Sequence, residues 1–240
     1  MKTIGILGGM GPEATADLYM QIVKIFQSKY NAKYDADFPP FVIYSLPLPD
    51  VVEISPAKEK EVAEREIVAY LTNGVQRLQA GGADFIAIAC NTVQCYLQEM
   101  RSAVSIPILS VATETASKLK QEGYTKVGVL GTNKTINSGL FERECISRNI
   151  ELIIPSKEQQ PIVTEVIMNI LAGKANENDK QKLKTIVQTL AEKGAEAIIL
   201  GCTDLPLLMK QEDFPLPLID TTNVMAQAVV TMNNSNGGLL

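Results

Sequence analysis

The chain of 240 residues contains no histidine. This absence excludes Ser-His-Asp and Cys-His nucleophile systems, and it excludes every metal site that needs an imidazole ligand. Any acid–base chemistry must therefore use cysteine, aspartate, glutamate, lysine or tyrosine side chains.

The sequence also has no excess of basic charge and no long apolar run, and we do not expect its opening residues to be a signal peptide. With 22 Lys and Arg against 27 Asp and Glu, the net charge is −5, which does not indicate binding to nucleic acid or to an anionic membrane. No apolar run approaches the roughly 20 residues of a membrane span, and glycines interrupt the opening "MKTIGILGGMGPEA" too early for a signal peptide. The four cysteines then indicate reduced thiols in a cytoplasmic protein.

Short apolar runs alternate with longer amphipathic stretches. The continuous hydrophobicity of "IGIL", "FIAIA" and "AIILG" is typical of parallel strands covered on both faces, so the pattern predicts an α/β fold with parallel sheets. The predicted strands are Thr3–Leu7, Phe41–Tyr44, Asp84–Ala89, Ile106–Leu109, Lys126–Leu130, Glu151–Ile154, Glu196–Leu200 and Leu216–Ile219. The predicted helices are Pro12–Lys29, Pro56–Ala80, Val93–Ala103, Ala112–Gln121, Ser138–Arg148, Gln160–Ala172, Asp179–Lys193 and Thr222–Thr231.

The two halves of the sequence repeat one another. "KTIGILGG" recurs as "KVGVLGTN", "AGGADFIAIACNT" as "AEKGAEAIILGCTD", and "SIPILS" as "PLPLID", in the same order. The repeat predicts two similar α/β lobes related by a pseudo-twofold axis, 1–108 plus 219–240 and 109–218. Because ligands of such sheets bind beyond the carboxyl ends of the strands, we expect the active site in the inter-lobe cleft, with Cys90 and Cys202 facing one another across it.

Two equivalent acid–base groups on opposite sides of a cleft suit racemisation or epimerisation at a carbon next to a carboxylate. One thiolate takes the Cα proton, and the opposite thiol delivers another proton to the other face. An unperturbed thiol has a pKa of about 8.5, which a helix N-terminus or a cation brings toward neutrality. We expect both cysteines to precede a helix, so that nearby N–H groups and the small polar residues Asn91, Thr92 and Thr203 can stabilise the charge on the substrate.

The glycines of "GILGGMGPE" could also indicate a dinucleotide-binding loop. Their spacing is G-x-x-G-G-x-G rather than G-x-G-x-x-G, and the second strand ends in "IYSLP" without an acidic residue to hold a ribose. We therefore interpret the stretch as a turn that offers backbone N–H groups to a small carboxylate.

Together, "GILGGMGPEAT", "CNT" at 90–92 and "GCTDLPLL" at 201–208 resemble the cofactor-independent aspartate/glutamate racemase family, from Lys2 to about Ala228. The resemblance implies an isomerase that racemises aspartate or glutamate, acts without pyridoxal phosphate or metal, and forms a homodimer. It implies that Cys90 and Cys202 are the catalytic acid–base residues. The candidate substrate-binding residues are Met10, Ser45, Asn91, Thr92, Thr132, Thr203 and Asp204.

Three positions depart from the family pattern and put the substrate side chain in question. Gln94 stands where relatives often carry histidine, and Val51 and Leu171 stand where aspartate-preferring relatives place cations. A racemase of broad or non-acidic specificity is therefore an alternative, as is a degenerate homologue that binds an amino acid as a sensor. Decarboxylases and cis-trans isomerases of the same superfamily are a further alternative, although the retention of two thiols argues against a decarboxylase and against a sensor.

The cysteines and Asp204 also have purely structural interpretations. A buried cysteine is most often a small hydrophobic residue, but recurrence after matched strands favours catalysis for Cys90 and Cys202. Cys95 is expected to be structural, because C-x₄-C without other ligands is a poor zinc site, and Cys145 is expected in the core. Asp204 could cap a helix at "TDLPLL" or interact with Cys202.

Overall fold

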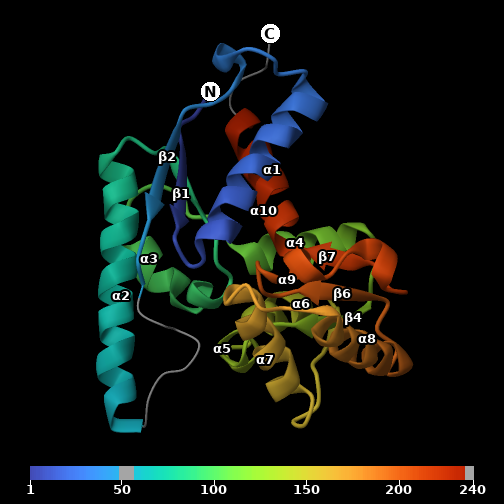
Figure 1. Ribbon diagram of the computed structural model, residues 1–240. Coiled ribbons are helices and arrows are strands. Elements are labelled where there is room, and N and C mark those ends of the chain that lie inside the picture. Colours follow the sequence, from blue (N-terminus) through green and yellow to red (C-terminus); the bar gives the residue numbers. More distant parts are fainter. Residues whose placement is uncertain (49–56, 236–240) are drawn as a thin grey trace. The chain divides into compact units, whose positions relative to one another are not determined.

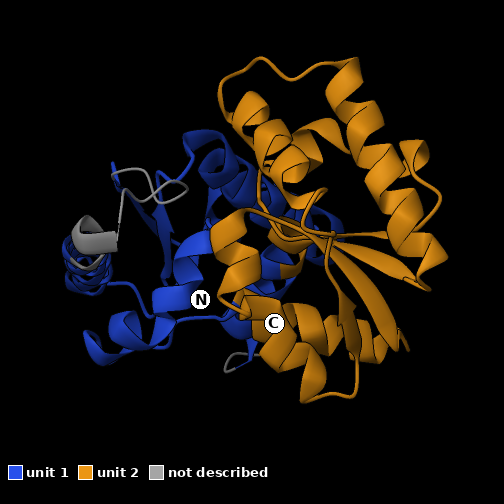
Figure 2. Ribbon diagram, turned by 90° about the horizontal axis from the view of Figure 1, so that it is seen from below, with its two compact units in different colours: residues 1–110, 225–240 blue, residues 111–224 orange. Residues whose placement is uncertain are grey.

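The computed structural model describes residues 1–48 and 57–235. The chain divides into two compact units, and Figure 2 colours them separately. Unit 1 comprises residues 1–110 and 225–240, and unit 2 comprises residues 111–224.

Unit 1 is built on a parallel sheet with the strand order β2-β1-β3. Side chains alternate between the two faces of β2: Phe41 makes an edge-to-face contact with Tyr19 of α1, whereas Val42 and Tyr44 pack into the apolar cluster that contains α2. The two long helices therefore cover opposite faces of this sheet, as Figure 1 shows. The elements are β1 (Ile4–Gly8), α1 (Pro12–Tyr30), η1 (Asp35–Asp37), β2 (Phe41–Ser45), α2 (Ala57–Ala80), β3 (Phe85–Ile88), η2 (Thr92–Tyr96) and α3 (Leu97–Ser102).

Unit 2 has a four-stranded parallel sheet with the order β5-β4-β6-β7. Its core joins buried side chains of β6 to those of α7 and α8, including Ile198, Ile167 and Leu190. The elements are α4 (Val111–Gln121), β4 (Lys126–Leu130), α5 (Asn133–Asn137), α6 (Leu140–Ile146), β5 (Glu151–Ile153), α7 (Gln160–Leu171), α8 (Glu177–Glu192), β6 (Ala197–Leu200), α9 (Leu205–Leu208), η3 (Gln211–Asp213), β7 (Leu218–Asp220) and α10 (Thr221–Asn234), the last of which ends in unit 1. The predicted α/β fold with parallel sheets is confirmed.

The internal repeat extends to the register of the strands. Leu7 of β1 pairs with Ile88 of β3, and Leu130 of β4 pairs with Leu200 of β6. One residue further on, Ala89 N donates to Leu7 O at 2.9 Å, and Gly201 N donates to Leu130 O at 2.6 Å. Cys90 and Cys202 are the next residues in the two units, so each stands at the same place in its own sheet.

The edges of β3 and β6 that face away from β1 and β4 also make equivalent hydrogen bonds in the two units. Ile86 N donates to Pro107 O at 2.8 Å, and Ile198 N donates to Pro217 O at 2.9 Å. In unit 2 this pairing continues as β7, but in unit 1 it is limited to an isolated bridge between Ile86 and Ile108. The predicted strand Ile106–Leu109 is therefore wrong in extent, because the segment pairs around Ile108 only.

Of two further predicted helices, one is divided in the structure and the other is shortened. The segment 93–103 forms the 3₁₀ helix η2 followed by α3, rather than one α-helix. The segment 138–148 contains only α6, because Gly139 has a φ of 62° and separates α6 from α5, which the sequence analysis does not predict. The start of the predicted helix at Pro56 lies outside the described residues.

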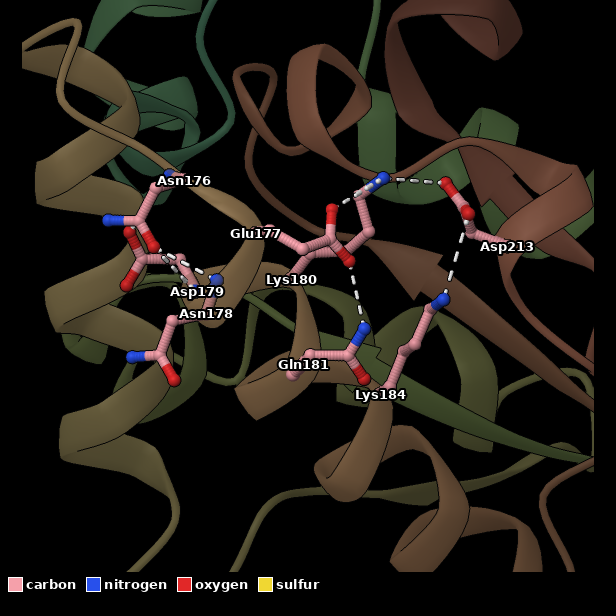
Figure 3. A network of polar contacts seen from close by, with 8 residues as sticks. All are labelled: Asn176, Glu177, Asn178, Asp179, Lys180, Gln181, Lys184 and Asp213. Carbon is pink, nitrogen blue, oxygen red and sulfur yellow. Dashed lines mark hydrogen bonds and ion pairs between the residues drawn. The ribbon is translucent and has the colours of Figure 1, made fainter.

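Helix α8 begins two residues earlier than expected because Asn176 caps it. Its side chain accepts from Asn178 N at 2.9 Å and from Asp179 N at 3.3 Å, and the Asp179 carboxylate accepts from Asn176 N at 3.2 Å. Beyond this capping box, Lys180 Nζ lies 3.0 Å from Asp213 Oδ2 (Figure 3). This ion pair fastens α8 to η3, the segment that follows α9 in the chain.

Candidate functional site

In unit 1, the candidate residues come from three neighbouring strand ends. Gly8 pairs with Ser45, and Leu7 pairs with Ile88, so β1, β2 and β3 finish at the same edge of the sheet. Met10 follows β1 by two residues, Ser45 is the last residue of β2, and Cys90 follows β3 by two residues. The carboxyl edge of this sheet is where ligands of open α/β sheets bind.

The turn after β1 is fixed by a threonine from the first turns of α1. Thr15 Oγ1 accepts from Gly9 N at 2.9 Å and donates to Gly11 O at 2.9 Å. Gly9 has a φ of +91°, and a Cβ on it would lie 2.5 Å from Leu46 N. Only glycine fits there, and among the backbone N–H groups of this turn that of Gly9 is already occupied by Thr15. Sequence analysis does not single out Thr15, whose signal is its position four residues after Gly11.

The motif after β3 is buried throughout. Cys90, Asn91 and Thr92 have exposed fractions of 6%, 3% and 6%, and Gln94 is 2% exposed. Gln94 N donates to Asn91 O at 3.0 Å as the chain enters η2. Cys90 therefore precedes a five-residue 3₁₀ helix, and the long helix expected to act on it with its dipole is not formed.

In unit 2, Thr132 stands just beyond β4 and caps α5. Its Oγ1 accepts from Thr135 N at 3.2 Å and lies 3.0 Å from Thr135 Oγ1. Gln160 Nε2, at the start of α7, donates to Gly131 O at 2.9 Å. The hydroxyl of Thr132 thus has a local structural partner, and its contact with substrate stays a prediction.

The motif after β6 contains a contact between a candidate thiol and an ionisable group. Cys202, Thr203 and Asp204 are buried, and Cys202 Sγ donates to Asp204 Oδ2 at 3.5 Å. Asp204 occupies the N-cap position of α9, but its side chain makes no capping hydrogen bond. Of the two alternatives for Asp204, the structure shows the interaction with Cys202.

The remaining two cysteines differ from this pair. Cys95 is half-buried and packs at the margin of the unit 1 core. Cys145 is fully buried in α6, as predicted, and burial raises the pKa of its thiol to about 11. None of the four cysteines, all of which lie in the described ranges, forms a disulfide.

The candidate residues therefore form two sets. Unit 1 holds the residues after β1, β2 and β3, and unit 2 holds those after β4 and β6. Their members are Met10, Ser45, Cys90, Asn91 and Thr92 in unit 1, and Thr132, Cys202, Thr203 and Asp204 in unit 2.

Positions that depart from the family pattern occupy different environments. Gln94 is buried beside the Cys90 motif. Leu171 is 44% exposed and ends α7, whereas Gln160 begins that helix near Gly131. Leu171 thus lies about 16 Å along the helix axis from Gln160. Val51 lies outside the described residues.

Within residues 1–48 and 57–235, no group of three or more Cys, Asp or Glu side chains is arranged to hold a metal ion. Over the same part of the chain, none of the helices combines the length and apolarity needed to cross a membrane.

Comparisons with known proteins cover nearly the whole chain. The family model described as Asp/Glu/Hydantoin racemase matches residues 7–229. The broad specificity amino-acid racemase RacX of Bacillus subtilis (strain 168) is 30% identical over 231 residues, which are 95% of this chain and 96% of that protein. The aspartate racemase of Picrophilus torridus is 26% identical with a TM-score of 0.79, covering 97% of this chain and 94% of that one. An aspartate racemase homologue from Pyrococcus horikoshii OT3 is 26% identical with a TM-score of 0.76, covering 97% and 99%.

Proposed function

Because the chain belongs to the Asp/Glu/hydantoin racemase family and is therefore an isomerase, we propose that it racemises a free α-amino acid with two thiols, Cys90 and Cys202, and without a cofactor. The observation that carries this proposal is the identical strand register of the two cysteines. Each is buried, and each lies two residues beyond the strand that pairs with the first strand of its unit.

In this proposal the two thiols serve opposite faces of Cα. The thiolate on one face takes the Cα proton, and the electron pair of that bond passes into the carboxylate to give an enolate-like dianion. The thiol on the other face then gives its proton to Cα, and the enantiomer is released. The two cysteines exchange protonation states in each turnover, so the reverse reaction uses them in opposite roles.

The substrate carboxylate needs hydrogen-bond donors at the carboxyl edges of the sheets. Asn91, Thr92 and Thr203 are buried polar side chains directly after the two cysteines, and they suit this task. Met10 and Ser45 adjoin the same edge in unit 1. Thr132 would contribute its hydroxyl from unit 2, in addition to capping α5.

The side chain of the substrate has two candidates. Aspartate or glutamate is the first, in keeping with the family description and with the Picrophilus torridus aspartate racemase. A broad or non-acidic range is the second, and the similarity to RacX together with the uncharged, buried Gln94 favours it.

The test is deuterium exchange at Cα. The pure protein is incubated in D₂O with EDTA and without pyridoxal phosphate, separately with each enantiomer of Asp, Glu, Ala, Arg and Lys. The proposal expects deuterium at Cα together with formation of the opposite enantiomer, measured by mass spectrometry and chiral chromatography. Absence of exchange with every amino acid would contradict it. The amino acid that exchanges fastest decides between the acidic and the broad range.

A homodimer, implied by the resemblance, and a cytoplasmic location, inferred from the cysteines, stay predictions. Light scattering coupled to size-exclusion chromatography tests the first, with a monomer of 26.1 kDa as the reference mass.

A further inference from the structure

The carboxamide of Gln160 lies where the strands of unit 2 end. Gln160 is the first residue of α7, and its Nε2 donates to Gly131 O at 2.9 Å. Gly131 directly follows β4 and precedes Thr132, a candidate substrate-binding residue. A Cβ on Gly131 would lie 3.4 Å from the carbonyl oxygen of Gly201, which precedes Cys202. The Gln160 carboxamide is therefore held against the turn that carries Thr132, and this turn touches the segment that carries Cys202.

The hydrogen bonds of this side chain decide which end of the carboxamide is which. A backbone carbonyl can only accept, so the atom that faces Gly131 O must be Nε2, which also donates to Thr164 Oγ1 at 3.4 Å. The other atom, Oε1, is buried, and within residues 1–48 and 57–235 no group donates to it. A buried acceptor without a donor is unfavourable, and such atoms commonly receive a hydrogen bond from a water or a ligand.

Every substrate of the proposed reaction brings donors that need such an acceptor. A free α-amino acid carries an ammonium group with three N–H bonds on Cα, whereas the polar residues assigned to its carboxylate act as donors. Two acceptors at the same edge of unit 2 already accept within the protein: Asp204 Oδ2 from Cys202 Sγ at 3.5 Å, and Thr132 Oγ1 from Thr135 N at 3.2 Å. Gln160 Oε1 is buried beside them with its accepting capacity unused.

We propose that Gln160 is a substrate-binding residue whose Oε1 accepts a hydrogen bond from the α-ammonium group, while Nε2 stays on Gly131 O. The inference rests on the proposed function, and it applies to acidic and broad-range substrates alike because the ammonium group is common to both. A neutral acceptor also suits the chemistry. The positive charge of the ammonium group makes the Cα proton more acidic, and a carboxamide binds the group without cancelling that charge.

The test compares two ligands that differ only in the ammonium group. They are the racemic amino acid that exchanges deuterium fastest and the carboxylic acid that lacks its α-amino group, for example succinate for aspartate or propionate for alanine. Isothermal titration calorimetry gives the Kd of each, and the racemate is already at equilibrium, so turnover adds no heat. The ratio of the two Kd values isolates the ammonium group, because a shift of Thr132 that weakened the whole site would raise both.

Three variants of Gln160 separate its acceptor from its donor. Gln160→Met keeps the length of the side chain and removes both. Gln160→Lys removes the acceptor, but its ammonium group can still donate to Gly131 O. Gln160→Glu keeps an acceptor, because a protonated carboxyl group donates to Gly131 O through its hydroxyl and retains a carbonyl oxygen in place of Oε1.

Gln159→Met is the matched control. Gln159 is the half-buried residue that precedes Gln160, and both ends of its carboxamide have protein partners. Its Oε1 accepts from Ser156 N at 3.1 Å, and its Nε2 donates to Thr189 Oγ1 at 3.2 Å. Loss of this side chain disturbs the start of α7 without removing an unused acceptor.

We expect Gln160→Met to raise the Kd of the amino acid by about 10- to 100-fold relative to that of the deaminated acid, the usual contribution of a hydrogen bond to a charged group. Gln160→Lys should raise this ratio at least as much, because its charge also repels the ammonium group. Gln160→Glu should keep the wild-type preference for the amino acid or increase it. Gln159→Met should change the ratio by less than about threefold.

Equal weakening of both ligands by Gln160→Met and Gln160→Lys, no weakening of either, or the same change of ratio in Gln159→Met would overturn the inference while leaving the two-thiol racemase intact. Failure of the wild-type protein to exchange deuterium with any amino acid would instead refute the proposed function and this inference with it. Thermal unfolding shows whether each variant is folded, and Gln160→Lys decides the matter if Gln160→Met does not fold.

Discussion

Thr15→Val tests how the glycine turn after β1 is held. The substitution keeps the shape of the side chain and removes the hydroxyl that bridges Gly9 N and Gly11 O, both at 2.9 Å. Thr15 is only 7% exposed, so water does not readily replace the lost partner of Gly9 N–H. A buried donor without a partner costs about 1 to 3 kcal/mol, and the second bond adds about 1, so we expect unfolding to become easier by about 2 to 4 kcal/mol.

For a chain of this size about 3 kcal/mol corresponds to a fall in Tm of about 6 to 12 °C, measurable by circular dichroism. The matched control is Thr185→Val, because Thr185 Oγ1 donates only to Gln181 O on an exposed face of α8. That variant should stay within about 0.5 kcal/mol of the parent protein. The turn also adjoins the proposed carboxylate site, so KM should rise in Thr15→Val and not in the control. Equal Tm values for the two variants would refute this account of the turn.

Three further predictions concern titratable groups of unit 2. Cys145, with its pKa raised to about 11, should react with iodoacetamide at pH 8 roughly a hundredfold more slowly than an ordinary thiol in a mass-spectrometric assay, and urea should abolish the difference. Burial raises the pKa of Glu114, and the attraction of the Arg148 charge opposes this shift only in part. At pH values above the usual carboxylate range, the charged form of Glu114 therefore destabilises the folded protein. Glu114→Gln should therefore raise Tm at pH 7 and leave it unchanged near about pH 3.5, and a lower Tm at pH 7 would contradict this. The hydrogen bond from Lys180 lowers the pKa of Asp213, so its stabilisation is present above the usual carboxylate range and is lost as pH falls through the lowered value. Asp213→Asn should accordingly lower Tm at pH 7 but not near about pH 2.

The sequence predicts the repeated strands well because burial on both faces leaves continuous apolar runs. β1, β3, β4 and β6 lie within one or two residues of their predicted bounds, and each belongs to one of the repeated segments. Predictions fail where backbone hydrogen bonding rather than hydrophobicity decides the structure. The predicted strand 106–109 forms only a bridge at Ile108, and Gly139 with its positive φ delays the start of a predicted helix.

The sequence pattern also does not predict the local contacts within the candidate site. The spacing of "GCTD" allows Asp204 either to cap a helix or to contact the Cys202 thiol. The three-dimensional structure is needed to show that it contacts Cys202 Sγ. The role of Thr15 depends on the conformation of the turn at Gly9. The equivalence of Cys90 and Cys202 is different: the repeat indicates it, and strand register then gives it a structural basis.

The central claim is that Cys90 and Cys202 are the two acid–base groups of one reaction. Its most direct test is the racemisation rate of Cys90→Ser, Cys202→Ser and Cys95→Ala, followed by chiral chromatography from a single enantiomer of the best substrate. The account predicts that each of the first two variants nearly abolishes racemisation, whereas Cys95→Ala, which changes a half-buried thiol at the core margin, retains most of it. A folded Cys90→Ser or Cys202→Ser variant that racemises at the wild-type rate would contradict the two-thiol mechanism.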